Sequence, residues 1–533
     1  MANQHAPHHP IIYVRGFAMS QGEIDQTTAD PFCGFNLGST VYRAVPDRKK
    51  PPRKHIFESP LVRLASDFGY SDVYEDGYDI VDPDWIAKDS NRLRYRSIVI
   101  YRYYDEASNL LGNGETPDIE TFARKLGELI LKVRDLTCAN EDNALGPADF
   151  RCHLVAHSMG GLVCRAFLQN PKLITAEARR LVDKFFTYAT PHNGIDAAGM
   201  NVPSWLTKAD LDNFNRKRMA EYLDLDAELA ATGRVDWLPE DRFPAKRVFT
   251  MVGTNRLDYE VAFGAARTFV GHGSDGLVRI ENATLQERKV DGSAGRPVAR
   301  AFCYRSHSGL FGIVNSEEAY QNLVRFLFGD VRVDVWAAIW AIQLPAKLQE
   351  EEKRGKKINA LYQFEVMAAP RGKLWYLTRR TAEEDSVACL THQEWLTNGE
   401  NEKNIYLSSV FLANRARINF ARPTLAYSFH LGVRVPDYEL ENTLWIDEHY
   451  EGSYLFRNTI VVEITPPSKA CSEWGVTYDW QDEGCKLPVS KIDAQSLATG
   501  EVEVRIEFGN ESKPGIRGDL FFVISGWNQE GVD

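Results

Sequence analysis

Residues 153–162, with the sequence HLVAHSMGGL, constrain the fold of this chain more than any other segment. An apolar run ends at Ser158, and a helical pattern begins directly after it. A strand that turns this sharply into a helix needs small residues two positions before and after the serine, where Ala156 and Gly160 stand. The turn lifts the hydroxyl out of the sheet edge, and the N–H of Met159 points where an oxyanion would form. The segment therefore predicts a nucleophilic serine on a strand–turn–helix.

Strand and helix signals alternate over the first 330 residues around this segment. An amphipathic helix is predicted over residues 119–136, and another over residues 317–328. Short apolar strands are predicted at residues 11–14, 97–101, 184–189, 247–252 and 299–304, besides the strand that leads into the serine. Such alternation predicts a mostly parallel sheet with helices on both faces.

Two stretches interrupt this alternation. Residues 47–89 are rich in Pro, Lys, Asp and Tyr, which predicts an irregular surface excursion. Residues 195–244 carry helical patterns between two strands, and we interpret them as a cap or lid; the alternative is a surface insertion without a role in the site. The apolar residues of this insertion are expected to form part of an acyl-binding wall: Leu211, Phe214, Met219, Tyr222 and Leu223.

The pattern changes near residue 330, and residues 331–533 predict an all-β, sandwich-like domain. Residues 502–508 alternate strictly between apolar and charged side chains, as a half-buried strand does. Eight of the eleven tryptophans fall in this region. Trp474 and Trp480 lie with Tyr478 in a polar stretch, which favours an exposed surface that recruits substrate or a partner. The alternative is a domain that supports the first one or builds an oligomer through the apolar residues 333–344.

Composition excludes several classes of function. The chain of 533 residues has a formal net charge of −12, which argues against nucleic-acid binding and against capture by anionic membranes unless a local basic patch exists. No apolar run is long enough to span a bilayer, and the first residues lack a signal-peptide pattern, so a cytoplasmic location is expected. Neither C-x-x-C nor H-E-x-x-H occurs among the eight cysteines and twelve histidines, so no metal and no cofactor is expected. Cys471 and Cys485 bracket a loop, where a disulfide and a reduced pair are both open.

A serine becomes a strong nucleophile when a histidine takes its proton and an acid orients that histidine. In the strand–turn–helix arrangement the chain order is serine, acid, histidine. Asp275 lies in the glycine-rich segment GSDGLV downstream of Ser158. His307 follows the predicted strand 299–304 and is the only histidine between Asp275 and residue 330. We therefore expect Asp275 and His307 to complete a triad with Ser158.

Several residues compete for these roles. Asp258 is the alternative acid. Three histidines are weaker candidates for the base, and each has a simpler interpretation: His157 packs beside the turn, His192 shapes a loop at the pocket rim, and His272 lies on the surface. A second oxyanion donor is expected after the first strand, where Gly16 lets the backbone approach and the N–H of Phe17 points inward.

Together, residues 10–17, 153–168, 189–194, 274–278 and 306–309 resemble the serine esterases and lipases of the α/β-hydrolase fold. The resemblance is greatest to bacterial lipase-like and GPI inositol-deacylase-like members, and it covers residues 8–330. It implies a nucleophile, an acid, a base and two oxyanion donors at Ser158, Asp275, His307, Phe17 and Met159. Members of the family usually have His-Gly before the oxyanion residue, where this chain has Arg15 and Gly16. Arg15 either holds this loop or meets an anionic part of the substrate.

The combined expectation is a metal-independent carboxylesterase or lipase with a C-terminal β domain. Its partner is an ester or lipid substrate, whose acyl and alcohol parts the sequence does not define, and neither does it define the oligomeric state. A phospholipase or another lipid-acting acyl hydrolase is the main alternative. Thioesterases, amidases and acyltransferases use the same triad, and a non-catalytic binding protein on a hydrolase fold is also possible.

Overall fold

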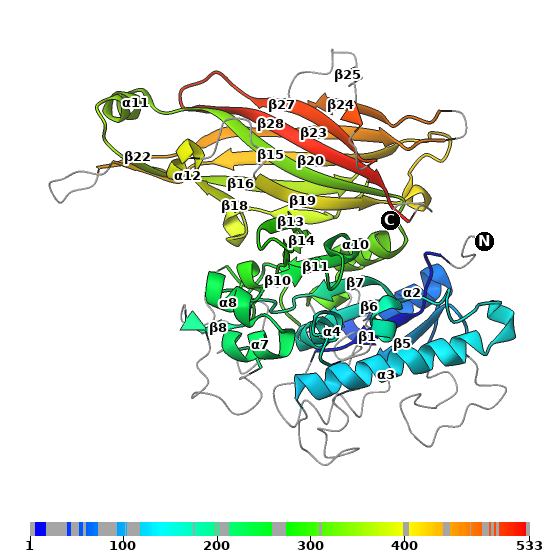
Figure 1. The fold of residues 1–533 in the computed structure, drawn as a ribbon. Coiled ribbons are helices and arrows are strands. Elements are labelled where there is room, and N and C mark those ends of the chain that lie inside the picture. The colour runs from blue at the N-terminus through cyan, green and yellow to red at the C-terminus, as the bar shows by residue number, and fades with distance from the viewer. Residues whose placement is uncertain are drawn as a thin grey trace. The chain divides into compact units, whose positions relative to one another are not determined.

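The computed structural model forms two compact units (Figure 1). The N-terminal unit comprises residues 1–300 and 304–323, and the β unit comprises residues 301–303 and 324–533. The sequence predicts the corresponding boundary at residues 330–331. The structure describes residues 6–16, 40–43, 53–56, 60–72, 93–101, 103, 118–173, 176–197, 200–201, 213–257, 273–308, 312–397, 405–440, 448–468, 471–481, 490–491, 495–496 and 500–528.

A seven-stranded sheet with the order β14-β11-β7-β6-β1-β5-β4 forms the centre of the N-terminal unit. Its strands are β1 (Ile11–Val14), β4 (Ser71–Asp72), β5 (Ser97–Tyr101), β6 (Cys152–His157), β7 (Val182–Tyr188), β11 (Val248–Gly253) and β14 (Ala299–Cys303). β1 pairs in parallel with β5 and β6, and β7 pairs in parallel with β6 and β11. The prediction of a mostly parallel sheet is confirmed, and the carboxyl ends of its parallel strands share one edge.

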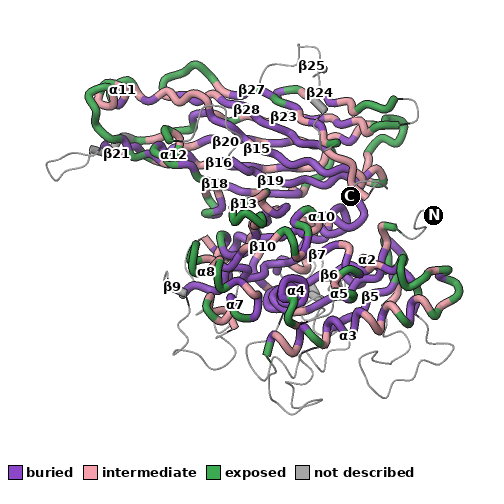
Figure 2. Tube along the Cα trace, viewed as in Figure 1, coloured by how far each residue is buried: buried purple, intermediate pink, exposed green. Residues whose placement is uncertain are grey.

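Helices pack around this sheet for reasons visible in their sequences. α3 (Ile119–Cys138) begins at Asp118, whose side chain accepts a hydrogen bond from the Thr121 N–H at 2.7 Å. Its apolar residues recur at helical spacing and are buried, so the prediction of this helix is confirmed. Every residue of α4 (Met159–Gln169) is buried, including Arg165, as the continuous purple of α4 shows (Figure 2). Other described α-helices of this unit are α2 (Pro60–Phe68) and α5 (Ala176–Arg180), and α10 (Glu317–Phe328) begins in it and ends in the β unit.

The predicted irregular stretch 47–89 contains more structure than expected. β2 (Thr40–Arg43) and β3 (Arg53–Ile56) form an antiparallel pair, and α2 buries Leu61, Leu64 and Phe68. The three apolar residues recur at three- and four-residue spacing, which is the helical period. The expectation of an irregular segment is therefore wrong for residues 60–68.

Insertion 195–244 contains β8 (Asp196–Ala197), β9 (Met200–Asn201), α7 (Arg216–Leu223), α8 (Asp226–Thr232) and β10 (Trp237–Pro239). β10 joins β12 (Gln286–Arg288) and β13 (Ala294–Pro297) in a small three-stranded sheet. Met219, Tyr222 and Leu223 of α7 have at most 1% of their surface exposed, and Asn170 after α4 donates to the Tyr222 carbonyl at 3.1 Å. These three side chains belong to the core of the unit, and Leu211 lies outside the described residues.

Two antiparallel sheets make up the β unit. The first has the order β19-β15-β28-β27-β26, and the second has the order β22-β21-β16-β20-β23-β24-β25, with β17 and β18 also paired to β16. The strands are β15 (Val331–Gln343), β16 (Ile358–Pro370), β17 (Thr378–Arg380), β18 (Ala388–Thr391), β19 (Ile405–Leu412), β20 (Leu425–Arg434), β21 (Asp437–Leu440), β22 (Glu448–Glu451), β23 (Tyr454–Thr465), β24 (Gly475–Trp480), β25 (Ser490–Lys491), β26 (Gln495–Ser496), β27 (Val502–Gly509) and β28 (Gly515–Gly526).

Apolar side chains from both sheets share one core, as in a sandwich. Phe429 of β20 and Phe522 of β28 meet across it, with ring centroids 5.9 Å apart. β27 turns its apolar residues inward and its charged residues outward, which confirms the predicted alternation. The apolar stretch 333–344 is mostly β15, which lies between β19 and β28. Val333, Val335, Ala337 and Ile339 belong to this core, whereas Trp336 and Trp340 are not part of it, and the Trp336 ring packs edge-on against Tyr406.

The predicted exposure of the aromatic residues near residue 478 is wrong for Trp480. Trp480 is 7% exposed, while Trp474 and Tyr478 are partly buried against the core. Cys471 is a free thiol in the structure, and Cys485 lies outside the described residues. Within the described parts of the chain, no helix is long and apolar enough to cross a membrane, and no cluster of three or more His, Cys, Asp or Glu is placed to hold a metal ion.

Candidate active site

Ser158 joins β6 to α4 in a backbone conformation that few non-glycine residues adopt. Its φ is 51° and its ψ is −127°, which costs on the order of 1–3 kcal/mol for an ordinary side chain. A Cβ atom on Gly160 would lie 2.4 Å from the Val14 carbonyl oxygen and 2.6 Å from that of Arg15. The close passage of β1 therefore explains why the second position after the serine carries no side chain.

The structure brings Ser158, His307 and Asp275 into one hydrogen-bonded chain. The Ser158 Oγ lies 2.9 Å from His307 Nε2, and His307 Nδ1 lies 2.9 Å from Asp275 Oδ2. The exposed fractions are 7% for the serine, 3% for the histidine and 1% for the aspartate. Because a carboxylate only accepts, Nδ1 of His307 carries the proton, and Nε2 is left to accept from the serine hydroxyl. The three residues follow β6, β11 and β14, at the carboxyl edge of the central sheet.

Backbone contacts fix Asp275 in this chain of hydrogen bonds. Its Oδ1 accepts from the N–H groups of Leu277 at 3.0 Å and Val278 at 2.8 Å, which leaves Oδ2 for the histidine. The His307 N–H donates to the Asp275 carbonyl at 3.0 Å, so the two loops are joined through their main chains as well. A Cβ atom on Gly253, at the end of β11, would lie 2.9 Å from the Asp275 Cβ. The acid therefore has one available position and one orientation.

The expected oxyanion donors are only partly described. Met159 is the first residue of α4, so its N–H is among the donors that no carbonyl within the helix accepts. Phe17 lies outside the described residues. Gly16 is described, and a Cβ atom there would lie 2.8 Å from the Ser158 Cβ, so the loop after β1 passes directly against the serine. The Tyr103 hydroxyl donates to the Arg15 carbonyl at 2.8 Å and holds this loop through its main chain.

His157 has a contact that sequence reasoning missed. Its Nε2 lies 2.9 Å from the His307 carbonyl oxygen, and the two rings are 5.0 Å apart. Burial, and next the charge of His307, hold the pKa of His157 well below its usual value, so it is neutral and donates from Nε2. The residue before the serine therefore positions the main chain of the candidate base. The position of His157 directly before Ser158 was the one feature of the sequence that could have indicated this role.

His192, a competing candidate for the base, takes no part in the hydrogen-bonded chain from Ser158 to Asp275. It is buried, and its Nε2 lies 3.2 Å from Thr187 Oγ1. Burial lowers the pKa of His192, with a further contribution from Arg165. His272 and Asp258, which compete for the base and the acid, lie outside the described residues.

Arg165 is the second group that the sequence did not reveal. It is 1% exposed, and its guanidinium donates to the carbonyls of His192 at 2.8 Å, Val235 at 3.0 Å and Trp237 at 2.9 Å. Its Nε donates to Gln169 on the same helix at 2.7 Å. Burial lowers the pKa of Arg165 to about 10, which leaves it charged at neutral pH. One cation on α4 therefore fastens the loop after β7 and the end of the insertion.

A second polar network fastens the start of the insertion. Asp196 accepts two hydrogen bonds from Arg216, at 2.9 and 3.0 Å, and one from Asn282 at 2.7 Å. Phe214 and Leu277 both pack against Ile195 beside this network, and Leu277 is two residues from Asp275. Phe214 is thus the residue of the predicted acyl-binding wall that the structure places next to the acid loop.

Known proteins give little to compare with this chain. No family model and no curated protein matches its sequence. Among solved structures, the mature lipase BlEst2 from Bacillus licheniformis is 16% identical with a TM-score of 0.31, over 60% of this chain and 91% of its own. The phospholipase PlaB from Legionella pneumophila is 13% identical with a TM-score of 0.28, over 83% of this chain and 90% of its own. Its complex with thio-NAD gives the same identity and score over 89% of its own chain. At these scores the similarity carries no information on substrate or activity.

Proposed function

We propose that this chain is a serine hydrolase of carboxylic esters, with Ser158 as nucleophile, His307 as base and Asp275 as acid. The observation that carries the proposal is the hydrogen-bonded chain from Ser158 Oγ through the His307 ring to Asp275, with 2.9 Å at both links. Buried carboxylates and imidazoles need hydrogen-bond partners, and these hydrogen bonds supply them. The serine hydroxyl stands at the end of the series, where it can meet a substrate.

The proposed reaction proceeds through an acyl-enzyme. Ser158 Oγ attacks the ester carbonyl carbon as its proton passes to His307 Nε2, and Asp275 stabilises the imidazolium that forms. The oxyanion is expected to accept from the N–H groups of Met159 and Phe17. The C–O bond to the alcohol then breaks, and His307 protonates the departing oxygen. Water next attacks the acyl-enzyme, gives a proton to His307, and releases the acid as Ser158 regains its proton.

An apolar acyl group suits this site better than a polar one, because Ile195, Phe214 and Leu277 form an apolar cluster against the loop that carries Asp275. This cluster favours a lipid-acting acyl hydrolase over one for small polar esters. The insertion 195–244 would then contribute through Phe214, whereas its α7 residues support the core.

Labelling with a fluorophosphonate probe tests the proposal. We expect one probe per chain on Ser158, no labelling of Ser158→Ala, and a loss of ester hydrolysis by about 10⁶-fold in Ser158→Ala and His307→Ala. A screen of nitrophenyl esters of increasing chain length, with a phospholipid included, then defines the acyl preference. A correctly folded wild-type chain that neither reacts with the probe nor hydrolyses any ester would overturn the proposal and favour a binding protein on this fold.

A further inference from the structure

Two neighbouring turns at one end of the β unit have an unusual composition. The first comprises residues 370–376, PRGKLWY, between β16 and β17, and the second comprises residues 413–424, ANRARINFARPT, between β19 and β20. Together we call them the basic loops. They contain no acidic residue and five cationic ones, in a chain whose net charge is −12: Arg371, Lys373, Arg415, Arg417 and Arg422. Such a local concentration of charge against the overall balance indicates a surface for an anionic partner.

The basic loops also expose large apolar side chains. Leu374 is fully exposed at 104%, Phe420 is 68% exposed, and Ile418 is 59% exposed. Three of the exposed large apolar residues in the described parts of the chain thus lie in the basic loops. Each of them is one or two residues from an arginine or lysine. Apolar side chains surrounded by cations are the pattern of proteins that insert into the interface of an anionic membrane.

Internal contacts hold these side chains out in solvent. Arg417 donates to the carbonyls of Asn414 at 3.1 Å and Arg422 at 2.9 Å, which closes the second loop on itself. In the first loop the Lys373 N–H donates to the Pro370 carbonyl at 3.1 Å. Gly372 has a φ of +74°, and a Cβ atom there would lie 2.6 Å from Ile418 Cδ1, so the two loops touch. The exposure is therefore a property of folded loops.

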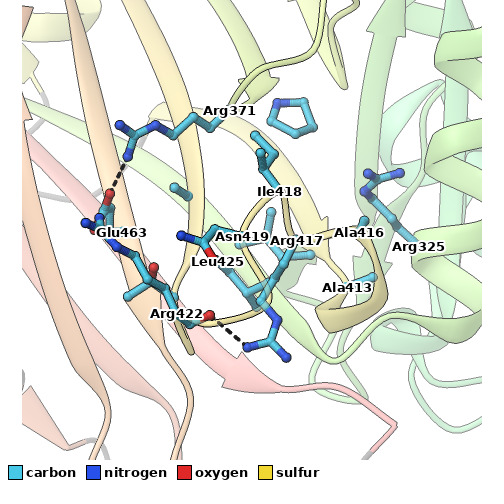
Figure 3. A pocket seen from close by; sticks show the side chains of 14 residues that line it. Arg325, Arg371, Ala413, Ala416, Arg417, Ile418, Asn419, Arg422, Leu425 and Glu463 are labelled. Atoms are coloured by element: carbon cyan, nitrogen blue, oxygen red, sulfur yellow. Dashed lines mark hydrogen bonds and ion pairs between the residues drawn. The ribbon is translucent and has the colours of Figure 1, made fainter.

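A cavity of about 260 Å³ opens beside Ile418 (Figure 3). Four arginines from three segments line it: Arg325, Arg371, Arg417 and Arg422. Arg371 forms an ion pair of 2.6 Å with Glu463, as the dashed line in the figure shows, whereas the side chain of Arg422 has no ion pair with any described residue. Acids also lie near the basic loops. Glu473 and Glu501 stand on other turns of the same end, and Asp479 lines a second cavity with Arg371, Lys373 and Arg422. Asp330 Oδ2 accepts from the Asn414 N–H at 2.6 Å, whereas the basic loops themselves carry only cations.

We infer that the basic loops dock the chain onto an anionic phospholipid surface. Leu374, Ile418 and Phe420 enter the acyl boundary, and the arginines and Lys373 contact headgroup phosphates. Each basic residue near an anionic membrane strengthens binding by about fivefold. Burial of a Phe or Ile side chain contributes at least about tenfold. This inference does not depend on the proposed hydrolase activity.

Vesicle flotation of the full chain tests this inference. We expect binding to vesicles of phosphatidylcholine mixed with phosphatidylglycerol, weak binding to phosphatidylcholine alone, and weakening by salt. Lys373→Gln with Arg422→Gln should lower the affinity about 25-fold. Ile418→Ser with Phe420→Ser should lower it at least about 100-fold, and Leu374→Ser gives an independent third measurement.

Matched control variants come from the opposite end of the same unit. In the pairing of β15 with β28, Val331 lies opposite Gly526 at the end of the β unit that carries the basic loops, and Gln343 lies opposite Gly515 at the other end. Lys347 in α11 (Ala346–Lys353) and Lys513 before β28 lie at this second end. Exposed Leu396 in α12 (His392–Thr397) lies there too, because its neighbour Trp395 donates to the Ile339 carbonyl at 3.0 Å. Lys347→Gln with Lys513→Gln, and Leu396→Ser, should change vesicle affinity by less than about twofold.

Several outcomes would overturn the inference. They are equal binding to both kinds of vesicle, unchanged binding in all three loop variants, or complete competition by millimolar inorganic phosphate, which would indicate a site for soluble phosphate. If each variant unfolds at the same temperature as the wild type, a loss of vesicle binding comes from the changed surface and not from unfolding. Ser158→Ala should bind vesicles like the wild type, so failure of docking and failure of catalysis are separate results.

Discussion

The buried charges of the N-terminal unit and the exposed cations of the basic loops in the β unit are used in opposite ways. In the N-terminal unit, Asp275 and Arg165 are almost completely buried, and each makes several hydrogen bonds. In the β unit, the basic loops hold their cations at the surface, above an apolar core shared by two sheets. A buried charge is costly unless it is paired, whereas an exposed one is screened by solvent. Substitution of the buried charges should therefore change chemistry and stability, and substitution of the cations of the basic loops should change binding.

The largest expected effect follows from the buried acid of the candidate triad. Asp275→Asn should lower kcat by about 10⁴-fold, because an amide cannot hold the His307 tautomer that accepts the serine proton. Asp519→Asn, at an equally buried acid of the β unit, should leave kcat within about twofold. Steady-state hydrolysis of a short nitrophenyl ester provides the measurement. If Asp258→Asn proved more damaging than Asp275→Asn, the assignment of the acid would be wrong.

The next effect is on stability and concerns Arg165. Arg165→Met should lower the free energy of unfolding by about 3–5 kcal/mol, since it leaves the carbonyls of His192, Val235 and Trp237 without their buried donor. Arg354→Met, which breaks a surface ion pair with Glu351 in the β unit, should leave the urea midpoint almost unchanged. Urea unfolding of both variants compares the two units directly. An equal loss of stability in the two variants would contradict the contrast between buried and exposed charges.

A pH effect should also separate the units, through a buried histidine. His153 lies beside Asp183 and Lys184, and burial, with a smaller contribution from Lys184, lowers its pKa to about 4. The unfolded state therefore binds one more proton than the folded state between about pH 6.5 and pH 4, so stability is complete above this window and is lost as the pH falls through it. The loss amounts to about 3 kcal/mol.

His153→Gln should make this part of the stability curve less steep, while the buried His157 and His192, whose pKa values are also lowered, keep the rest of the slope. Urea unfolding at pH 7 and at pH 4.5 gives the stability of the N-terminal unit when the loss of probe labelling at Ser158 is used as the signal. Most tryptophans report on the β unit, so fluorescence should follow a different pH dependence. Parallel curves for the wild type and His153→Gln would exclude His153 as the cause.

The smallest effect concerns substrate preference. Phe214→Ala should lower kcat/KM for long-chain esters relative to short ones by about tenfold, because it removes apolar surface from the cluster that Ile195 forms with Phe214 and Leu277. Phe420→Ala removes a similar ring from the β unit and should leave this ratio unchanged for dissolved esters. Labelling by a small fluorophosphonate should be the same in both variants. An unchanged ratio in Phe214→Ala would make the insertion a support without a role in specificity.

Local patterns in the sequence carried much of the fold and the candidate residues. The strand–turn–helix at Ser158 is encoded within ten residues, and the spacing in α3 is helical throughout, so no distant contact is needed to recognise them. The catalytic roles of Ser158, Asp275 and His307 stay a prediction, although the structure places their side chains in hydrogen-bonding distance.

Features that depend on distant partners could not be predicted. The partners of Arg165 lie 27, 70 and 72 residues away, and nothing in the sequence of α4 indicates them. Trp480 was misjudged because its polar neighbours suggest exposure, whereas the pairing of β24 with β23 turns its ring to the core. Helix α2 was missed because the composition of residues 47–89 conceals nine residues of regular spacing.

The pairing of β15 with β28 has a consequence for synthesis on the ribosome. β15 ends at Gln343, but its partner β28 ends at Gly526, so the first sheet of the β unit lacks a central strand until 183 further residues have been made. At about 5–20 residues per second, the apolar residues of β15 wait for about 10–40 s without that neighbour. Over the same interval the whole N-terminal unit has already left the ribosome and is free to fold. A premature stop codon just before β28 would therefore release a chain with a complete candidate triad and an unfinished, aggregation-prone sheet.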